Sequence, residues 1–257
     1  MQIKDIKAID IHTHIDHGVR YDSPDEVKCY YTAYKEKLLE LEKAANIEYL
    51  FASTFASVLT DKVIKPENEY TYRLSQECDD IFQWVVIDPR NDDTFRQAEY
   101  MLSSEKCVGI KLHPVYHKYS LEDYSDKLFS FSSEHTSIVL IHPEKNMDYI
   151  LPMADKYPDT TFIMAHLGDE SGVRAVKNSK NNNVYVDTSG IASSNNLIVE
   201  YAVEQIGSEH ILFGTDTYAA GFQRGRIEYA LISDADKANI LRNNALKLFE
   251  KHLKPLT

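Results

Sequence analysis

The chain has 257 residues, of which 43% are hydrophobic and 26% charged, and its formal net charge is −12. This composition is typical of a globular protein with a large core, and we expect one domain over residues 1–257. The acidic balance disfavours nucleic acid as a partner, because phosphate backbones are also negative. The chain has no run of 18 apolar residues, and its first ten lack a signal-peptide pattern, so we expect a cytoplasmic protein, with no membrane contact, that acts on a small molecule.

Short apolar runs of strand length recur eight times along the chain. They cover residues 6–11, 47–54, 81–88, 107–113, 137–142, 161–166, 183–189 and 211–216. Between them lie segments whose apolar residues repeat at helical spacing, among them 35–45, 92–102 and 122–135. After the last run, Ser233 and Asp236 form a capping box, which predicts the start of a closing helix.

Apolar strands that alternate with helices predict an α/β fold with a parallel sheet. Eight such units fit a (β/α)8 TIM barrel in a single domain, whose usual length is about 250 residues. An open doubly wound sheet is the competing architecture. It would favour a glycine-rich turn after the first strand, and His12-Thr13-His14 stands there instead.

Polar side chains gather at the ends of these predicted strands, which meet at one mouth in a TIM barrel. The residues are His12, His14, Lys111, His113, His142, His166 and Asp216. Side chains alternate along a strand, so His12 and His14 share a face, as do Lys111 and His113. Imidazoles with one carboxylate are usual ligands of Zn²⁺ and similar ions. A lone strand-end histidine is more often structural, so the prediction rests on the whole set.

The motifs DIHTH, GIKLHP, IVLIHP, MAHLG, FGTD and NNALKLF resemble those of the metal-dependent amidohydrolase superfamily, in particular its amidohydrolase-2 branch, which includes decarboxylases as well as hydrolases. The resemblance runs from residue 8 to about 249. It implies that His12, His14, His142 and Asp216 bind one divalent metal ion, with Zn²⁺ favoured over Mn²⁺. It also implies that His166 acts as a general acid or base, and that Asp216 accepts a proton from the water that the metal activates.

Lys111 has two interpretations under this resemblance. In binuclear members a lysine on the fourth strand is carboxylated and bridges two ions, whereas in mononuclear members such a lysine could hold a substrate carboxylate. An unmodified lysine repels a metal unless it meets an anion, and we favour substrate contact or a structural role, hence one ion. His113 is expected to line the substrate site, with a hydrogen-bonded rim residue as the alternative. Arg224 and Arg226 are expected on a helix surface, with neutralisation of an anionic substrate as the alternative.

These residues together predict an enzyme. The favoured function is a metal-dependent hydrolase in which metal-activated water attacks the carbonyl carbon of an amide, lactone or related bond. The alternative is a non-oxidative, metal-dependent decarboxylase, a lyase of the same fold. A third hypothesis is a barrel that binds a metal or ligand without turnover. A homodimer is left open, since family members commonly form one.

Overall fold

The computed structural model describes residues 2–15, 34–217 and 219–253, and its centre is a sheet of eight parallel strands in the order β1 to β8. The strands are β1 (Ala8–Ile15), β2 (Ile47–Thr54), β3 (Ile81–Val86), β4 (Cys107–Leu112), β5 (Ile138–Ile141), β6 (Thr161–Met164), β7 (Val184–Asp187) and β8 (Ile211–Leu212). The first and last strands also meet, because the Ile11 amide donates to the Phe213 carbonyl oxygen at 3.0 Å. The predicted (β/α)8 barrel is therefore confirmed.

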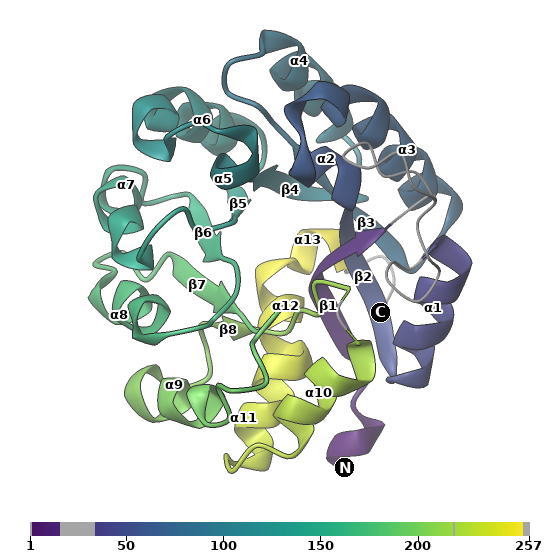
Figure 1. Ribbon diagram of the computed structural model, residues 1–257, viewed down its shortest axis with the longest axis vertical. Helices are drawn as coiled ribbons and strands as arrows, with labels where there is room; N and C mark the ends of the chain where they lie inside the picture. Colours follow the sequence, from purple (N-terminus) through teal and green to yellow (C-terminus); the bar gives the residue numbers. More distant parts are fainter. Residues whose placement is uncertain (1, 16–33, 218, 254–257) are drawn as a thin grey trace.

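Helices surround this ring of strands (Figure 1). They are α1 (Lys35–Ala44), α2 (Phe55–Leu59), α3 (Ile64–Glu77), α4 (Asp92–Met101), α5 (Pro114–His117), α6 (Leu121–His135), α7 (Leu151–Lys156), α8 (Glu170–Asn178), α9 (Ile198–Ile206), α10 (Ala220–Glu228), α11 (Asp234–Ala238), α12 (Asn244–Leu248) and α13 (Glu250–Leu253). The predicted helices at 35–45, 92–102 and 122–135 correspond to α1, α4 and α6. The Ser233 side chain accepts from the Asp236 amide at the start of α11, as the capping box predicts.

The strands bury both of their faces, which is why their sequences are apolar throughout. Side chains inside the barrel include Phe51, Trp84 and Leu140, and the C-terminal helices close this inner core with Phe249. The Phe249 ring lies 4.7 Å from that of Phe51. Unlike the other helices, α12 and α13 appear across the opening of the ring in Figure 1, where Phe249 and Leu253 pack against the inner core. The closed end leaves the carboxyl ends of the strands as the side available to a site.

Arg224 on α10 is buried, so the expectation of a solvated side chain is wrong. Its guanidinium donates to the carbonyl oxygens of Ile6 at 2.9 Å and Asn46 at 3.1 Å. It ties α10 to the entrance of β1 and to the turn before β2. Arg226 also donates to backbone carbonyl groups, those of Asn195 and Ala192. Both side chains therefore hold loops together.

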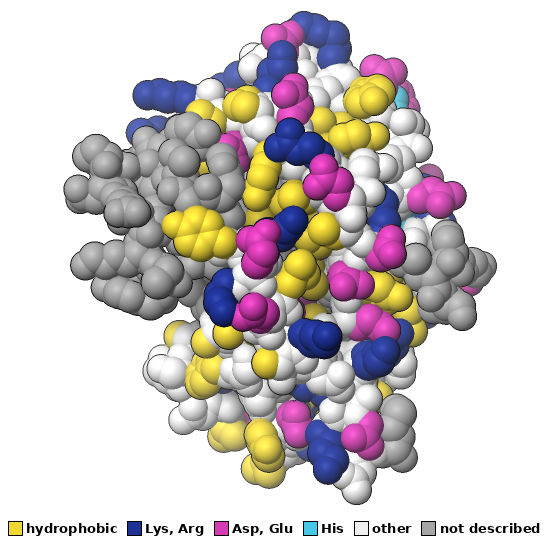
Figure 2. Space-filling model, turned by 90° about the vertical axis from the view of Figure 1, so that its right-hand side faces the viewer, with side chains coloured by type: hydrophobic (Ala, Val, Ile, Leu, Met, Phe, Trp, Pro, Cys, Tyr) yellow, Lys and Arg dark blue, Asp and Glu magenta, His cyan; other side chains and the backbone are white. Residues whose placement is uncertain are grey.

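Acidic and basic side chains are interspersed over the visible, described part of the face in Figure 2. On the surface Glu48, for example, pairs with Lys7 at 2.9 Å and with Arg242 at 2.8 Å. Exposed pairs of this kind contribute little to stability, about 0–1 kcal/mol each, so the core carries most of it. Among the described helices, none has the length and apolarity that crossing a bilayer requires.

Candidate metal centre

The carboxyl ends of β1, β6 and β8 bring three predicted site residues together. His12, His166 and Asp216 each offer one ligand atom, and these atoms all lie within 4.8 Å of one another. Asp216 Oδ1 is 3.7 Å from His12 Nε2 and 3.2 Å from Nε2 of His14. The residues are separated by up to about 200 positions in the chain, and the barrel places them at one point.

The other predicted histidines adjoin this cluster. The His142 ring lies 5.1 Å from that of His166 and stacks on that of His113 at 4.0 Å. The His12 ring lies 5.3 Å from that of His14 and 5.1 Å from that of His166. Among the described residues, the tight group of ligand atoms includes His166, for which the family resemblance implies acid–base chemistry, rather than His142. The division of roles between these two rings stays a prediction.

Hydrogen bonds indicate which nitrogen is free in two of the rings. Nδ1 of His142 lies 3.1 Å from the carbonyl oxygen of Pro143, and Nδ1 of His166 lies 3.1 Å from that of Ser189. A carbonyl oxygen only accepts, so each Nδ1 carries the proton. In the neutral ring Nε2 then keeps a lone pair, which is what a metal ion needs from histidine.

Asp187 gives the same result for His12. Nδ1 of this ring lies 2.8 Å from Asp187 Oδ2, while Nε2 lies 2.8 Å from Lys111 Nζ. A carboxylate only accepts, so Nδ1 carries the ring proton and Nε2 has the lone pair. Burial lowers the pKa of Lys111 to about 8. The predicted substrate residue Lys111 thus lies inside the cluster.

The charge states also suit a cation. Burial, then Lys111, lowers the pKa of His12 to about 3, and burial with His166 does the same for His142. Burial opposes ionisation of Asp216, but its hydrogen bond with His14 and the nearby imidazoles outweigh burial and lower the pKa of the carboxyl. Neutral imidazoles beside an ionised carboxylate are the ligand forms that Zn²⁺ and Mn²⁺ bind. The residues present therefore fit a divalent metal.

His113 lies beside the cluster and also has a structural contact. Burial lowers the pKa of its imidazole, and Nδ1 accepts from the Tyr116 amide at 3.4 Å, which caps α5. This bond matches the rim alternative. Contact between His113 and a substrate stays a prediction.

The backbone at the site is held in a conformation that side chains rarely adopt. His166, Asp216 and Thr217 have φ angles of 66°, 56° and 67°, in the left-handed region. Such residues cost about 1–2 kcal/mol each and occur often at functional sites. Here the Asp216 amide donates to the His12 carbonyl oxygen at 2.8 Å, and the Thr217 hydroxyl accepts from the His14 amide at 2.7 Å. These bonds to β1 hold the strained turn in place.

Two buried aspartates that support the site were not identified from the sequence. Asp187 ends β7 and contacts the His12 ring. Asp10 lies two residues before His12 in β1, and its side chain accepts from the amides of His12 at 3.0 Å and Thr215 at 3.1 Å. The sequence does hold one signal for Asp187, since this acidic residue stands at the end of an apolar strand, as Asp216 stands after another. No histidine lies next to Asp187 in the sequence, so the signal is weak.

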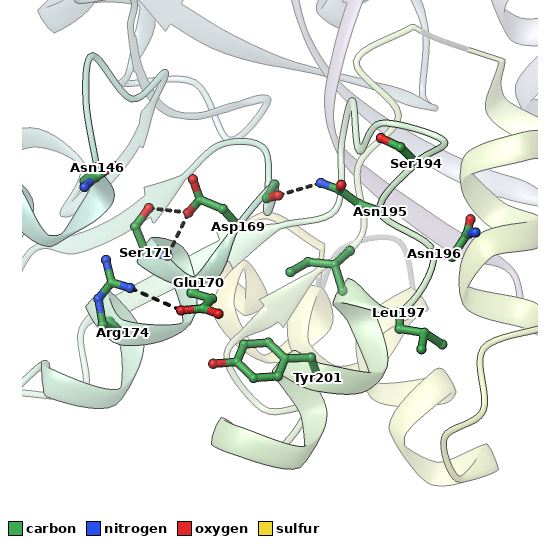
Figure 3. A pocket seen from close by; sticks show the side chains of 12 residues that line it. Asn146, Asp169, Glu170, Ser171, Arg174, Ser194, Asn195, Asn196, Leu197 and Tyr201 are labelled. Atoms are coloured by element: carbon green, nitrogen blue, oxygen red, sulfur yellow. Dashed lines mark hydrogen bonds and ion pairs between the residues drawn. The ribbon is translucent and has the colours of Figure 1, made fainter.

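A pocket of about 750 Å³ lies between the segments that follow β6 and β7. Figure 3 shows Asn195 pointing from the second loop toward the loop that carries Asp169. The Asn195 amide donates to the Gly168 carbonyl oxygen at 2.6 Å, and Gly168 follows His166 by two residues. None of the predicted metal ligands lines this pocket. It forms part of the rim around the mouth.

The match to a protein family agrees with this geometry. The model of the family described as Amidohydrolase matches residues 9–251, nearly the whole chain. The chain belongs to the amidohydrolase family. The resemblance inferred from the motifs is therefore confirmed. No curated protein sequence matches the chain significantly.

Solved structures show the same fold at low sequence identity. A 2,6-dihydroxybenzoate decarboxylase in complex with 2,6-dihydroxybenzoate is 16% identical, with a TM-score of 0.76 over 97% of this chain and 100% of that one. A dihydroxybenzoic acid decarboxylase from Polaromonas sp. JS666, with bound manganese and 2-nitroresorcinol, is 17% identical, with a TM-score of 0.70 over 96% and 97%. A protein assigned as a 2-pyrone-4,6-dicarboxylic acid hydrolase from Acinetobacter baumannii, with citric acid bound, is 16% identical, with a TM-score of 0.68 over 95% and 100%.

Proposed function

We propose that this amidohydrolase is a metal-dependent hydrolase that cleaves an amide, lactone or related bond of a small carboxylate-bearing molecule. The observation that carries the proposal is the meeting of His12, His166 and Asp216 at the barrel mouth, within 4.8 Å of one another. The ligand set would be His12, His14, His142 and Asp216, with one ion. Zn²⁺ is favoured, and Mn²⁺ has support from the manganese bound in a similar fold.

When bound, the ion would polarise a carbonyl oxygen and lower the pKa of a water molecule. The chain's own residues would do the rest. Asp216 is ionised and lies at the centre of the cluster, so it would accept the proton of the attacking water. His166 offers Nε2 as a second proton acceptor. It would pass a proton to the leaving group once protonated.

Lys111 would bind the substrate's carboxylate. It is fully buried, and the negative charges of Asp187 and Asp216 partly offset the cost of burying its ammonium group. In the structure described here its Nζ contacts His12 Nε2, so it would turn away from that ring when the metal binds and meet the substrate's anion instead. This role predicts selectivity for acids over their esters or amides.

Non-oxidative decarboxylation is the second candidate, and the decarboxylases of similar fold favour it. The same Lys111 would hold the carboxylate before it leaves, and His166 would deliver a proton to the substrate carbon. The two candidates differ in whether water becomes part of the organic product. A panel of lactones, amides and hydroxybenzoic acids, run in ¹⁸O-labelled water, separates them. Hydrolysis places ¹⁸O in the organic product. Decarboxylation releases CO2 and leaves the organic product without ¹⁸O.

Asp216→Asn tests the predicted proton acceptor. We expect kcat to fall by about 10²–10⁴, the usual contribution of a general base. Asp126→Asn is the matched control, because Asp126 lies exposed on α6 and pairs with Lys156. Activity of Asp216→Asn within threefold of the control would contradict the proposed role. If metal-loaded protein turned over nothing in the panel, the non-catalytic barrel would be the remaining hypothesis.

A further inference from the structure

Asp187 links three parts of the metal centre. It is fully buried at the end of β7, and its Oδ2 lies 2.8 Å from His12 Nδ1. Its Oδ1 accepts from the backbone amides of His166 at 3.1 Å and Ser189 at 2.8 Å. One carboxylate thus contacts the ring of one predicted site residue and holds the strained backbone of another.

These contacts define where the proton of the His12 ring lies. Asp187 Oδ2 is a carboxylate oxygen and only accepts, so the single proton of the neutral His12 ring is on Nδ1. Lys111 Nζ lies 2.8 Å from Nε2 of the same ring. The carboxylate therefore selects the form of His12 whose Nε2 is free for a metal.

Ser189 does the same for His166. Its hydroxyl contacts Asp187 Oδ1, an oxygen that already accepts two amides, so the single hydroxyl proton goes to that oxygen. The Ser189 Oγ can then only accept, and it lies 2.8 Å from His12 Nδ1 and 3.0 Å from His166 Nδ1. The Ser189 carbonyl oxygen also accepts from His166 Nδ1. Both rings are left with Nε2 free.

We propose that Asp187 and Ser189 are positioning residues that fix the Nδ1–H tautomer of both His12 and His166, so that Nε2 of His12 is free for the metal ion and Nε2 of His166 is free to accept a proton beside it. The proposal rests on the metal site of the proposed function. It assigns no contact with substrate to either residue. Their effect is on the affinity of the ion and on the form of the rings.

Asp187→Asn is the sharpest test, because it keeps the shape of the side chain and reverses one hydrogen bond. The amide oxygen must take the Oδ1 position, where two backbone amides donate, so the NH2 group faces His12 Nδ1. An NH2 group donates, which moves the ring proton to Nε2 and removes the lone pair that the metal needs. We expect Zn²⁺ and Mn²⁺ affinities to fall about 10–100-fold or more, the usual loss when the partner of a metal-binding histidine is removed.

The measurement is the Kd of each metal alone, by competition with a chelator, on the full chain. Asp126→Asn is the matched control, and Ser189→Ala should weaken binding less, since the Ser189 carbonyl oxygen still orients His166. Far-UV circular dichroism in the presence of EDTA reports whether each variant is folded. A folded Asp187→Asn protein that binds metal within twofold of wild type would overturn the proposal.

A second measurement needs no variant. In ¹⁵N-labelled, metal-free wild-type protein, the imidazole nitrogen shifts should report Nδ1–H for His12 and His166. Nε2–H in either ring would overturn the proposal even if Asp187→Asn did not fold. If wild-type protein had the Nδ1–H tautomers but bound neither metal, the proposed metal-dependent function would fail while the assigned tautomers stood.

Discussion

Gly190 lies directly behind two predicted site residues, so its replacement by alanine would press on both of them. Its φ angle is +61°. A Cβ built there would lie 3.0 Å from His166 Nδ1 and 3.3 Å from Asp216 Oδ2, both closer than ordinary van der Waals contact. His166 and Asp216 are held by hydrogen bonds to neighbouring strands and cannot both move away freely. Gly190→Ala should therefore affect stability and metal binding together.

The two effects have separate magnitudes. A left-handed backbone angle at a residue with a side chain costs about 1–2 kcal/mol. For a domain of this size each kcal/mol lowers Tm by about 2–4 °C, so a fall of about 2–8 °C is expected. Displacing a metal-binding group by a few tenths of an ångström should weaken metal affinity about tenfold or more, as loss of its supporting contacts does.

Gly207→Ala is the matched control. Gly207 ends α9 with φ 71° and ψ −176°, and its Cβ would meet only the Glu209 side chain, remote from the predicted ligands. It should lose at least as much stability as Gly190→Ala, because that backbone region is nearly exclusive to glycine, but it should bind metal as wild type does. Thermal unfolding in EDTA and chelator competition measure the two quantities. Equal metal affinity in the two variants would refute the packing described around Gly190.

Two further substitutions test the packing around the site. Neither carboxylate oxygen of buried Glu42 has a hydrogen-bond partner in the described structure; burial, then Asp10, raises its pKa well above the usual value. The folded state keeps a proton that the unfolded chain releases above about pH 4.5, so stability is lost as pH rises. Glu42→Leu should raise the free energy of unfolding by about 1–3 kcal/mol at pH 7 and less at pH 5, measured with urea; a gain equal at both pH values would contradict this explanation. Trp84→Phe removes the indole N–H that donates to the Ile11 carbonyl oxygen at 2.7 Å and leaves a small cavity. It should lower the free energy of unfolding by about 2 kcal/mol in the same assay, and a loss under about 0.5 kcal/mol would count against that hydrogen bond.

The barrel could be predicted because each strand is buried on both faces and is therefore apolar along its length. The eighth strand shows the limit of that rule. The run at 211–216 is apolar only at its start, and β8 ends at Leu212, after which the chain turns so that the Thr215 and Asp216 amides donate to His12. The hydrophobic pattern locates a strand, but the strand ends where its backbone groups form hydrogen bonds outside the sheet, and the pattern does not show that point.

The candidate site was predictable only in part, and for a related reason. His12 lies in the first buried strand and Asp216 follows the last, and both carry metal-binding groups, so the set of strand-end residues can be recognised in the sequence. Asp187 can be identified as part of the site only from its contact with His12, which is 175 residues away in the chain. The same holds for Arg224, whose partners are the backbone carbonyl groups of Ile6 and Asn46. Such contacts depend on the closed barrel and are not visible in local pattern.

The seam between β1 and β8 bears on when the protein could first hold an ion during its synthesis. Thr215 donates to Asp10, 205 residues earlier, and Asp216 completes the cluster only after this contact forms. A nascent chain on the ribosome would carry His12 from the beginning yet lack its carboxylate partner Asp216 until the last strand had emerged. Ion capture should therefore follow completion of the ring, and a chain released before β8 should be recovered without metal.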